Sequence, residues 1–404
     1  MRNAQNETDV MPEIWLVVGT RPEAVKLAPV ARALASGGRM RPVLIATGQH
    51  PEMVGQALAT FGLTADENLT VNRRTGSQPE LLSGLLTGLE EVAGRRPPTA
   101  VIVQGDTTTT LAGALTAFWL RVPVVHLEAG LRSFDLGAPF PEELNRKLVT
   151  QAAALHLAPT PDAAANLLAE GVPEENVLVA GNTVVDAILT VTDGSTTVHD
   201  PELATLLENA TRGAVKLMLV TLHRRESWGE PMRRVLRAVA RLMASDPELR
   251  VVLPAHPNPE VRDLVRAELA DSPGALITGS LPYPELAATL AASTLVLSDS
   301  GGIQEEAPTF GVPVLVLRDV TERMEAVNAG CALLVGTDHD KIVSTASLLL
   351  NDPAARTRMM SKGNPFGDGA AAERTEQALA YLLGLAAEPP TPFRPASANE
   401  PAEV

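Results

Sequence analysis

Several side chains that could move protons lie just after apolar runs of this sequence. Glu128, Asp106 and His223 each come within three residues of the end of such a run. A carboxylate at the end of a buried strand needs a partner or a raised pKa, and strongly perturbed carboxylates are candidates for chemistry. Glu128 fits that description, whereas Asp106 also fits an ordinary helix N-cap. His223 precedes Arg224 and Arg225, a pattern that favours an anion site over a structural role.

A second motif combines small residues with the start of a helix. "TLVLSDSGGIQEEAPTF" predicts a strand, a turn and a helix, with Ser300, Gly301 and Gly302 in the turn. Glycines let the backbone approach a ligand, and the N–H groups at a helix start attract phosphate. A plain tight turn is the alternative interpretation. Glu306 lies one turn inside the helix, where a carboxylate could accept hydrogen bonds from a ribose diol, and Arg323 follows the next apolar run.

Other charged residues are ambiguous. Arg21 and Lys26 lie in the first turns of the helix predicted after "EIWLVVGT", where cations oppose the helix dipole unless an anion arrives. Solvated surface cations are the alternative. Glu142 opens another predicted helix, where an acid usually complements the dipole. Arg318 could join Arg323 in closing over an anion.

The elements that must position these residues alternate between strands and helices. Continuous runs rich in Val, Ile and Leu suit strands that are buried on both faces, and their alternation with amphipathic segments predicts parallel sheets. The runs are too numerous for one comfortable sheet, so we expect two doubly wound domains. The runs lie at 13–18, 42–47, 100–104, 123–128, 176–180, 216–220, 250–254, 275–278, 294–298, 313–317 and 332–335.

Composition narrows the function. The 404 residues carry a net charge of −15, which argues against a nucleic-acid partner. One cysteine excludes disulfides and thiolate-rich metal sites, and no cluster has zinc-ligand spacing, so we expect no metal. No GxGxxG follows a strand and no P-loop is present. No run is long enough to span a membrane, which favours a cytoplasmic protein without a membrane partner.

The chain contains a series of motifs that are more specific together than any one of them is alone. In order along the chain they are "GTRPE", "GDTTTT", "HLEAGLRS", "PEELNR", "GNTVVD", "HRRES", "PAHPNP", "DSGGIQEEAP" and "RDVTER". With them the chain resembles the bacterial non-hydrolysing UDP-N-acetylglucosamine 2-epimerases from about residue 12 to 384. The resemblance implies the glycosyltransferase-B fold, with two Rossmann-like doubly wound domains and a cleft between them. We expect domains at 12–183 and 184–366, a C-terminal helix at about 367–384 that returns to the first domain, and disordered tails at 1–11 and 386–404.

The resemblance implies an enzyme that interconverts UDP-N-acetylglucosamine (UDP-GlcNAc) and UDP-N-acetylmannosamine (UDP-ManNAc) without a cofactor. UDP leaves by anti elimination, 2-acetamidoglucal forms, and UDP adds back after C2 is protonated from the opposite face. By resemblance, the carboxylates that act as acid and base are Asp106, Glu128 and Glu142. The residues that support the diphosphate are His223, Arg21, Ser300, Gly301, Gly302 and Arg323. Glu306 holds the ribose, and Lys26 lies on the N-terminal side of the cleft. Leu286 stands where relatives often have a phenylalanine against uracil.

The resemblance also implies a homodimer and a second, regulatory position for UDP-GlcNAc. Its matching residues are Gln49, Arg74, Arg224 and His256. The chain departs from the family at Glu52, where relatives often have a glutamine.

Alternative functions remain open at this point. A 2-epimerase of a modified UDP-sugar, such as a 2,3-diacetamido uronic acid, would use the same reaction. A hydrolysing epimerase would release free N-acetylmannosamine. A glycosyltransferase of the same fold would not require carboxylates on both faces of C2, and a non-catalytic binder would be expected to lose some of the three acids.

Overall fold

The chain forms two compact units. The computed structural model describes residues 11–71, 73–192, 197–224, 227–256 and 258–396. Unit 1 contains the chain up to Ala187 together with Gly367–Arg394, and unit 2 contains Ile188–Phe366. The helix α7 (Thr183–Val191) carries the chain from unit 1 into unit 2.

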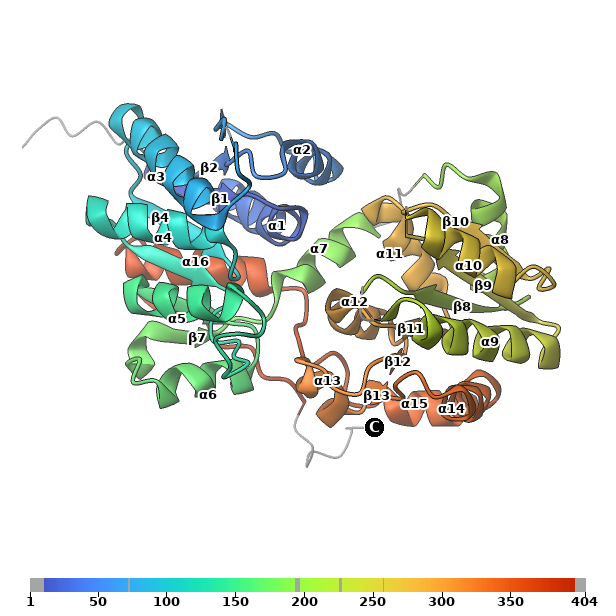
Figure 1. Cartoon of the computed structure of the whole chain (residues 1–404). Helices are drawn as coiled ribbons and strands as arrows, with labels where there is room; N and C mark the ends of the chain where they lie inside the picture. Colours follow the sequence, from blue (N-terminus) through green and yellow to red (C-terminus); the bar gives the residue numbers. More distant parts are fainter. Residues whose placement is uncertain (1–10, 72, 193–196, 225–226, 257, 397–404) are drawn as a thin grey trace, which may run out of the picture. The chain divides into compact units, whose positions relative to one another are not determined.

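In the described part of unit 1, the strands form one parallel sheet in the order β3-β2-β1-β4-β5-β6-β7 (Figure 1). The order reverses between β1 and β4, which is where open α/β sheets bind ligands at the carboxyl ends of their strands. The strands are β1 (Glu13–Val18), β2 (Arg41–Ala46), β3 (Glu67–Asn68), β4 (Ala100–Gln104), β5 (Val124–Leu127), β6 (Leu155–Ala158) and β7 (Val177–Val179). The helices are α1 (Arg21–Gly37), α2 (Pro51–Thr60), α3 (Gln78–Arg95), α4 (Thr108–Leu120), α5 (Glu142–Ala152), α6 (Pro161–Ala169) and α16 (Ala371–Leu382).

Helices cover both faces of this sheet. Apolar side chains of α3 and α4, such as Leu85 and Leu111, pack with Trp15, Val43 and Val101 of the strands. On the other side α1 packs against α16, the helix formed after the chain returns from unit 2 (Figure 1). Because both faces are buried, the strands need no alternation of polar and apolar residues, and β1 is apolar along almost its whole length.

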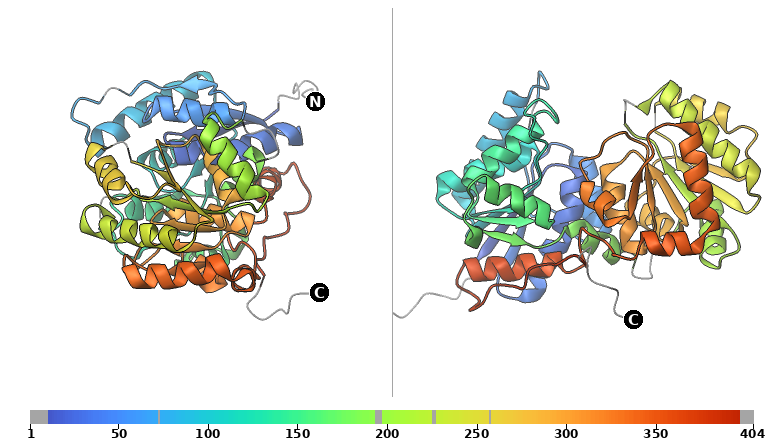
Figure 2. Two further views of the ribbon diagram at one scale, coloured as in Figure 1. Left: turned by 90° about the vertical axis from the view of Figure 1, so that its right-hand side faces the viewer. Right: turned by 90° about the horizontal axis from the view of Figure 1, so that it is seen from below.

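In the described part of unit 2, the parallel sheet has the order β10-β9-β8-β11-β12-β13, with the reversal between β8 and β11. Its strands run side by side between layers of helices (Figure 2). The strands are β8 (Lys216–Thr221), β9 (Leu249–Pro254), β10 (Ala275–Thr278), β11 (Leu295–Ser298), β12 (Val314–Val316) and β13 (Ala332–Leu334). The helices are α8 (Pro201–Thr211), α9 (Glu230–Ser245), α10 (Pro259–Glu268), α11 (Tyr283–Ala292), α12 (Gly301–Glu306), α13 (Met324–Ala329), α14 (His339–Asn351) and α15 (Pro353–Met359).

Two expectations from the sequence need correction. Strands β3 and β6 were missed, because β3 is only two residues long and His156 interrupts the apolar character of β6. A disordered tail was expected from residue 386, but residues 386–396 lie in the described part of the chain. Phe393 is only 5% exposed, its N–H donates to the Val179 carbonyl of β7 at 2.8 Å, and its ring lies under Arg374. One aromatic anchor thus fixes a segment whose composition favoured disorder.

Candidate active site

Glu128 lies directly after β5 in a strained backbone conformation. Its φ of 63° is in the left-handed region, which costs free energy for a residue with a Cβ and is found preferentially at functional sites. Its carboxylate is 9% exposed and pairs with the ammonium of Lys26 from α1. The Gln104 side chain donates to the same oxygen at 2.8 Å. Lys26 is therefore a buried partner of Glu128 and not a solvated surface cation.

Asp106 lies at the turn after β4, the strand next to β5. It is not the N-cap of α4, because that position belongs to Thr107, whose hydroxyl accepts from the Thr110 N–H. The Asp106 carboxylate instead accepts a hydrogen bond from Arg146 Nε at 2.9 Å, and the Asp106 backbone carbonyl accepts one from the Asn145 side chain at 2.8 Å. Two consecutive residues of α5 thus hold this acid from outside its own turn.

A buried histidine of the neighbouring strand also holds this turn in place. The Nε2 atom of His126, in β5, lies 2.8 Å from the carbonyl of Gly105. A carbonyl can only accept, so Nε2 carries the proton. Burial lowers the pKa of His126 to about 3, which keeps the ring neutral at physiological pH. Gly105 itself has a φ of 71°, a conformation that favours glycine immediately before Asp106.

Glu142 and Arg21 occupy the starts of two helices of unit 1. Glu142 is the first residue of α5, one turn before Arg146, and is partly exposed. Its neighbour Glu143 is fully buried and accepts from the N–H groups of Ser133 and Phe134, so it shapes the preceding loop.

Arg21 is the first residue of α1, in the turn after β1, and is partly exposed. Because β1 and β4 are paired neighbours, the turn of Arg21 and the turn of Asp106 share the carboxyl edge of the sheet.

The four consecutive threonines of "GDTTTT" bond to different segments. Thr108 donates to Gln78 at the start of α3 at 2.7 Å, and Thr109 donates to Gln49, in the loop after β2, at 2.9 Å. Gln49 is therefore linked to the helix that follows Asp106. Arg74 lies in an exposed loop, and the backbone N–H of Arg74 donates to the Glu80 carboxylate. Poor helix formers are used here because their hydroxyls join the loops of one sheet edge.

In unit 2, His223 and Arg224 follow β8 at the reversal of strand order. The buried carboxylate of Asp299, after β11, accepts the N–H of His223 at 2.9 Å and that of Arg224 at 3.1 Å. The Arg224 side chain also donates to the Asp299 carbonyl. Arg225, the next residue of the motif, lies outside the described residues.

The turn 300–302 and Arg323 lie together. A Cβ placed on Gly301 would lie 3.5 Å from the Arg323 guanidinium carbon, so the cation covers the start of α12. Arg323 is oriented by Glu305 at 2.8 Å. Ser300 is the N-cap of α12 but makes no side-chain capping bond, and a Cβ on Gly302 would lie 3.9 Å from the Ser300 hydroxyl oxygen, at ordinary contact distance. The structure therefore brings together the hydroxyl, glycines and cation that the sequence singled out.

Glu306 ends α12 and is nearly buried. The Tyr283 hydroxyl, from α11, donates to it at 3.2 Å. Leu286 lies one turn further along α11 and is partly exposed.

Arg318 makes a paired contact with Glu322, at 2.9 and 3.3 Å. Although burial opposes the charge, the hydrogen bonds from Arg318 lower the pKa of Glu322 to about 2. Arg318 is therefore held by a local carboxylate. His256 lies after β9, where its ring meets the edge of Trp228 with centroids 5.2 Å apart.

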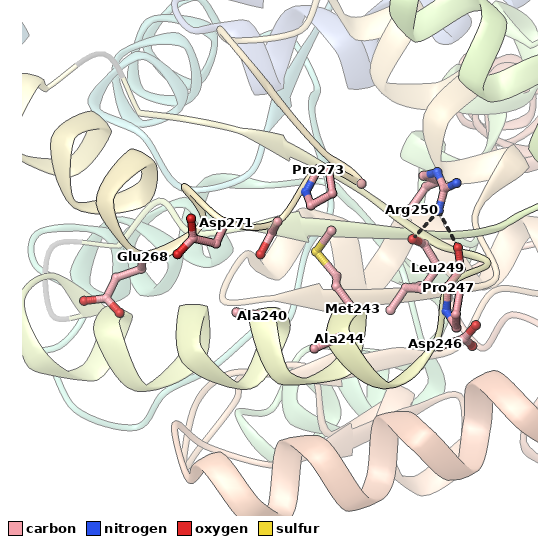
Figure 3. Close-up of a pocket in the computed structure, with 12 residues that line it drawn as sticks. Ala240, Met243, Ala244, Asp246, Pro247, Leu249, Arg250, Glu268, Asp271 and Pro273 are labelled. Carbon is pink, nitrogen blue, oxygen red and sulfur yellow. Dashed lines mark hydrogen bonds between the residues drawn. The ribbon is translucent and has the colours of Figure 1, made fainter.

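A pocket of about 590 Å³ in unit 2 lies away from these residues. It is formed by the end of α9, the start of β9 and the turn before β10, at the amino ends of the strands. Figure 3 shows Met243 in its middle, with Glu268 and Asp271 at one end and Arg250 at the other. Ligands of open α/β sheets bind at the opposite edge, so this pocket is not part of the candidate site.

The described residues contain neither a candidate metal cluster nor a helix suited to a membrane. No cluster of three or more His, Cys, Asp or Glu side chains there could hold a metal ion. No helix in the same part of the chain has both the length and the apolar character to cross a membrane.

Sequence reasoning missed the residues that hold the candidates in place. Arg146, Asn145 and Asp299 lie within quoted motifs but had no assigned role. Gln104 was read as the end of an apolar run, although its side chain contacts Glu128. The signal was weak, because a partner 40 or 102 residues away leaves no spacing pattern in the sequence.

Known proteins match almost the whole chain. The family model described as "UDP-N-acetylglucosamine 2-epimerase" matches residues 32–380. A UDP-N-acetylglucosamine 2-epimerase of Yersinia pestis is 42% identical over 372 residues, covering 91% of this chain and 98% of the relative. The enzyme of Bacillus subtilis is 40% identical over 381 residues, covering 94% and 98%.

Solved structures agree. The crystal structure of a putative UDP-N-acetylglucosamine 2-epimerase from Listeria monocytogenes superposes with a TM-score of 0.88 at 36% identity, covering 95% of this chain and 100% of that chain. The enzyme of Neisseria meningitidis, which was solved bound to UDP-GlcNAc, gives a TM-score of 0.80 at 37% identity, covering 92% and 100%.

A more distant match concerns the fold alone. The spinosyn rhamnosyltransferase SpnG matches with a TM-score of 0.57 at 18% identity, covering 90% of this chain and 99% of that chain. With two Rossmann-like sheets, the predicted glycosyltransferase-B fold is confirmed. The identity to curated enzymes over more than nine-tenths of the sequence shows that the chain belongs to the UDP-N-acetylglucosamine 2-epimerase family.

Proposed function

We propose that this chain interconverts UDP-GlcNAc and UDP-ManNAc by elimination and re-addition of UDP. A base removes the C2 proton while the C1–O bond breaks and its electron pair leaves with the diphosphate, which gives UDP and 2-acetamidoglucal. UDP then adds back to C1, and C2 receives a proton from the opposite face. Such a reaction needs proton-transfer groups on both faces of C2 and cations or N–H donors at the leaving diphosphate.

One observation carries the proposal. Two acids, Asp106 and Glu128, follow neighbouring strands of one sheet, and each is held by a cation from another element. Separate partners let the two carboxylates keep fixed and different positions. We assign proton transfer to Asp106, Glu128 and Glu142, the last of which begins the helix that holds Asp106. In this assignment Lys26 affects the reaction indirectly, because its ammonium pairs with the Glu128 carboxylate.

Unit 2 supplies the groups that suit UDP. We assign the diphosphate to His223, the turn 300–302 and Arg323, together with Arg21 of unit 1. The contact of Arg323 with Gly301 supports this assignment, because it puts a guanidinium beside backbone N–H groups. Glu306 would accept the ribose hydroxyls while Tyr283 orients it. The aliphatic side chain of Leu286 would pack against uracil.

Three charge-removing substitutions test the assignment. Asp106→Asn, Glu128→Gln and Glu142→Gln should each lower turnover of UDP-GlcNAc by at least ~100-fold, which is typical of a lost acid or base. Asp162→Asn is the matched control, because Asp162 is an exposed acid in the first turn of α6. Unchanged turnover in all three variants would refute the proposal.

Starting from each epimer separately sharpens the same experiment. The proton is removed from opposite faces of C2 in UDP-GlcNAc and UDP-ManNAc. A variant that has lost the base of one face should therefore lose elimination from one epimer more strongly than from the other. Equal losses from both epimers in every variant would contradict the assignment of separate bases.

The homodimer stays a prediction, and exposed apolar side chains of unit 1 support it. Trp119 is 62% exposed on α4, and Leu144 and Leu148 are exposed on the adjacent α5. Isolated large apolar residues are normal at surfaces, but a group on neighbouring helices favours an interface. Trp119→Glu should shift the mass measured by light scattering towards the monomer. An unchanged dimer mass would place the interface elsewhere.

The regulatory position also stays a prediction. Gln49 and Arg74 belong to unit 1, and Arg224 and His256 belong to unit 2. A sigmoidal dependence of rate on UDP-GlcNAc that Arg74→Ala makes hyperbolic would support it, and a hyperbolic curve in the wild-type protein would refute it. The cytoplasmic location, which the sequence favours because no run is long enough to span a membrane, also stays a prediction.

A further inference from the structure

Glu23 is a buried carboxylate that has no assigned role in the reaction. It lies at the third position of α1, where an acid often completes a capping box with the N-cap residue. One of its oxygens does so: Oε2 accepts the N–H of Gly19 at 2.9 Å, the N–H of Thr20 at 2.6 Å and the Thr20 hydroxyl at 2.8 Å. These donors all belong to the turn that carries Arg21.

The other oxygen faces a different turn. Oε1 accepts the Thr107 hydroxyl at 2.6 Å and lies 3.3 Å from the Thr110 hydroxyl. Thr107 directly follows Asp106 and is the N-cap of α4. A capping box does not require this second set of contacts, which joins residues 84 and 87 positions apart in the sequence.

Burial makes this arrangement costly. Glu23 is 1% exposed, and burial raises the pKa of its carboxyl although four groups donate hydrogen bonds to it. A helix start at the surface would obtain the same cap from an exposed acid without this cost. The location between two turns therefore indicates a role beyond capping.

We propose that Glu23 is a positioning residue of the epimerase reaction, in which one carboxylate fixes the turn of Arg21 relative to the turn of Asp106. The proposal rests on the proposed function, in which Arg21 supports the leaving diphosphate and Asp106 transfers a proton. Both events occur in one transition state, so a small change in the distance between the two turns lowers the rate. In this proposal Glu23 acts through the two turns and not by touching the substrate.

Side-chain chemistry predicts a graded series of variants. In Glu23→Gln the amide oxygen can accept from Gly19 and Thr20, and the amide NH₂ can donate to the Thr107 hydroxyl oxygen, so both turns stay connected. In Glu23→Ala both sets of contacts are lost. We expect kcat to fall about 100-fold in Glu23→Ala with KM changed less than about threefold, and Glu23→Gln to keep kcat within about tenfold.

Glu376→Ala is the matched control. Glu376 is also a buried acid of unit 1, but it pairs with Arg39 at the far end of α1. Its loss should lower the melting temperature and leave kcat of the folded enzyme unchanged. If Glu23→Ala behaves in the same way, with kcat within twofold of wild type, Glu23 is a structural residue and the proposal is wrong.

A double-mutant cycle tests the link to Thr107. If Glu23 acts through that hydroxyl, Glu23→Ala combined with Thr107→Val should cost little more in kcat than the worse single variant. Effects that multiply would show that the two residues act independently, which would also overturn the proposal.

Hydrogen exchange separates this proposal from the proposed function, because it needs no substrate. Glu23→Ala should expose the amides of residues 105–110 to faster exchange, and Glu376→Ala should not. If the wild-type protein does not act on UDP-GlcNAc, the proposed function fails and this measurement still decides whether Glu23 holds the turn. Unchanged exchange at 105–110 would refute the link in either case.

Discussion

Arg146 holds two carboxylates at once, so its removal should affect both stability and turnover. Its Nε donates to Asp106 Oδ2 at 2.9 Å, and its Nη1 lies 3.1 Å from Glu143 Oε2. In Arg146→Met, the partners that the fully buried Glu143 keeps among the described residues are the N–H groups of Ser133 and Phe134. Asp106 loses its only cation among the described residues but is partly exposed to water.

The size of the effect follows from these contacts. Removing one partner of a buried ion pair costs about 3–5 kcal/mol. The two remaining N–H donors to Glu143 and the water around Asp106 place this substitution at the lower end, at about 3 kcal/mol. For a domain of about 150–250 residues this lowers the melting temperature by about 6–12 °C. A displacement of Asp106 by about 1 Å should lower kcat roughly 100-fold.

Arg39→Met separates the two effects. Arg39 donates to the buried Glu376 at 3.0 Å in the same unit and makes no contact with the turn of Asp106 in the described structure. The control should lose stability and keep its turnover. Calorimetric melts and initial rates, the latter measured well below both transitions, provide the comparison. A kcat of Arg146→Met within twofold of that of Arg39→Met would refute the reasoning.

Two further predictions concern packing and pH. A Cβ on Gly19 would lie 2.1 Å from Thr109 Oγ1, so Gly19→Ala should destabilise by ~1–3 kcal/mol, whereas Gly55→Ala, with open space in α2, should stabilise by ~0.5–1 kcal/mol. Thermal melts that give the reverse order would contradict this. Burial lowers the pKa of His156 from 6.5 to about 4, so only the unfolded state gains a proton just below pH 6.5, and stability falls as pH falls. The free energy of unfolding should therefore fall by about 2 kcal/mol less between pH 7 and 5 in His156→Gln than in the wild-type protein. Urea titrations at several pH values measure this free energy. An equal dependence on pH in the two proteins would contradict the assignment of the effect to His156.

Much of the fold could be predicted because buried parallel strands leave a direct signal. The continuous apolar runs at 13–18 and 275–278 coincide with β1 and β10. The signal fails where a strand is short or carries a polar residue, as in β3 and β6. It also fails after residue 386, because composition does not reveal that a single side chain, Phe393, anchors the segment.

The candidate site could be predicted only in part. Residues at strand ends were found because the carboxyl edge of a parallel sheet collects them, as with Asp106 and Glu128. Their partners could not be found, because Lys26 and Arg146 come from helices far away in the sequence. Glu23 shows the same limit of local reasoning: its spacing indicates a capping box, and only the packed structure reveals the second turn.

Proton NMR in D₂O tests the central claim most directly. The purified protein is incubated with UDP-GlcNAc and no acceptor, and the sugar signals are followed over time. The account predicts that UDP-ManNAc appears and that C2 carries deuterium in both epimers. Accumulation of free N-acetylmannosamine and UDP would identify a hydrolysing enzyme, and an unchanged spectrum would contradict the assignment of UDP-GlcNAc as the substrate.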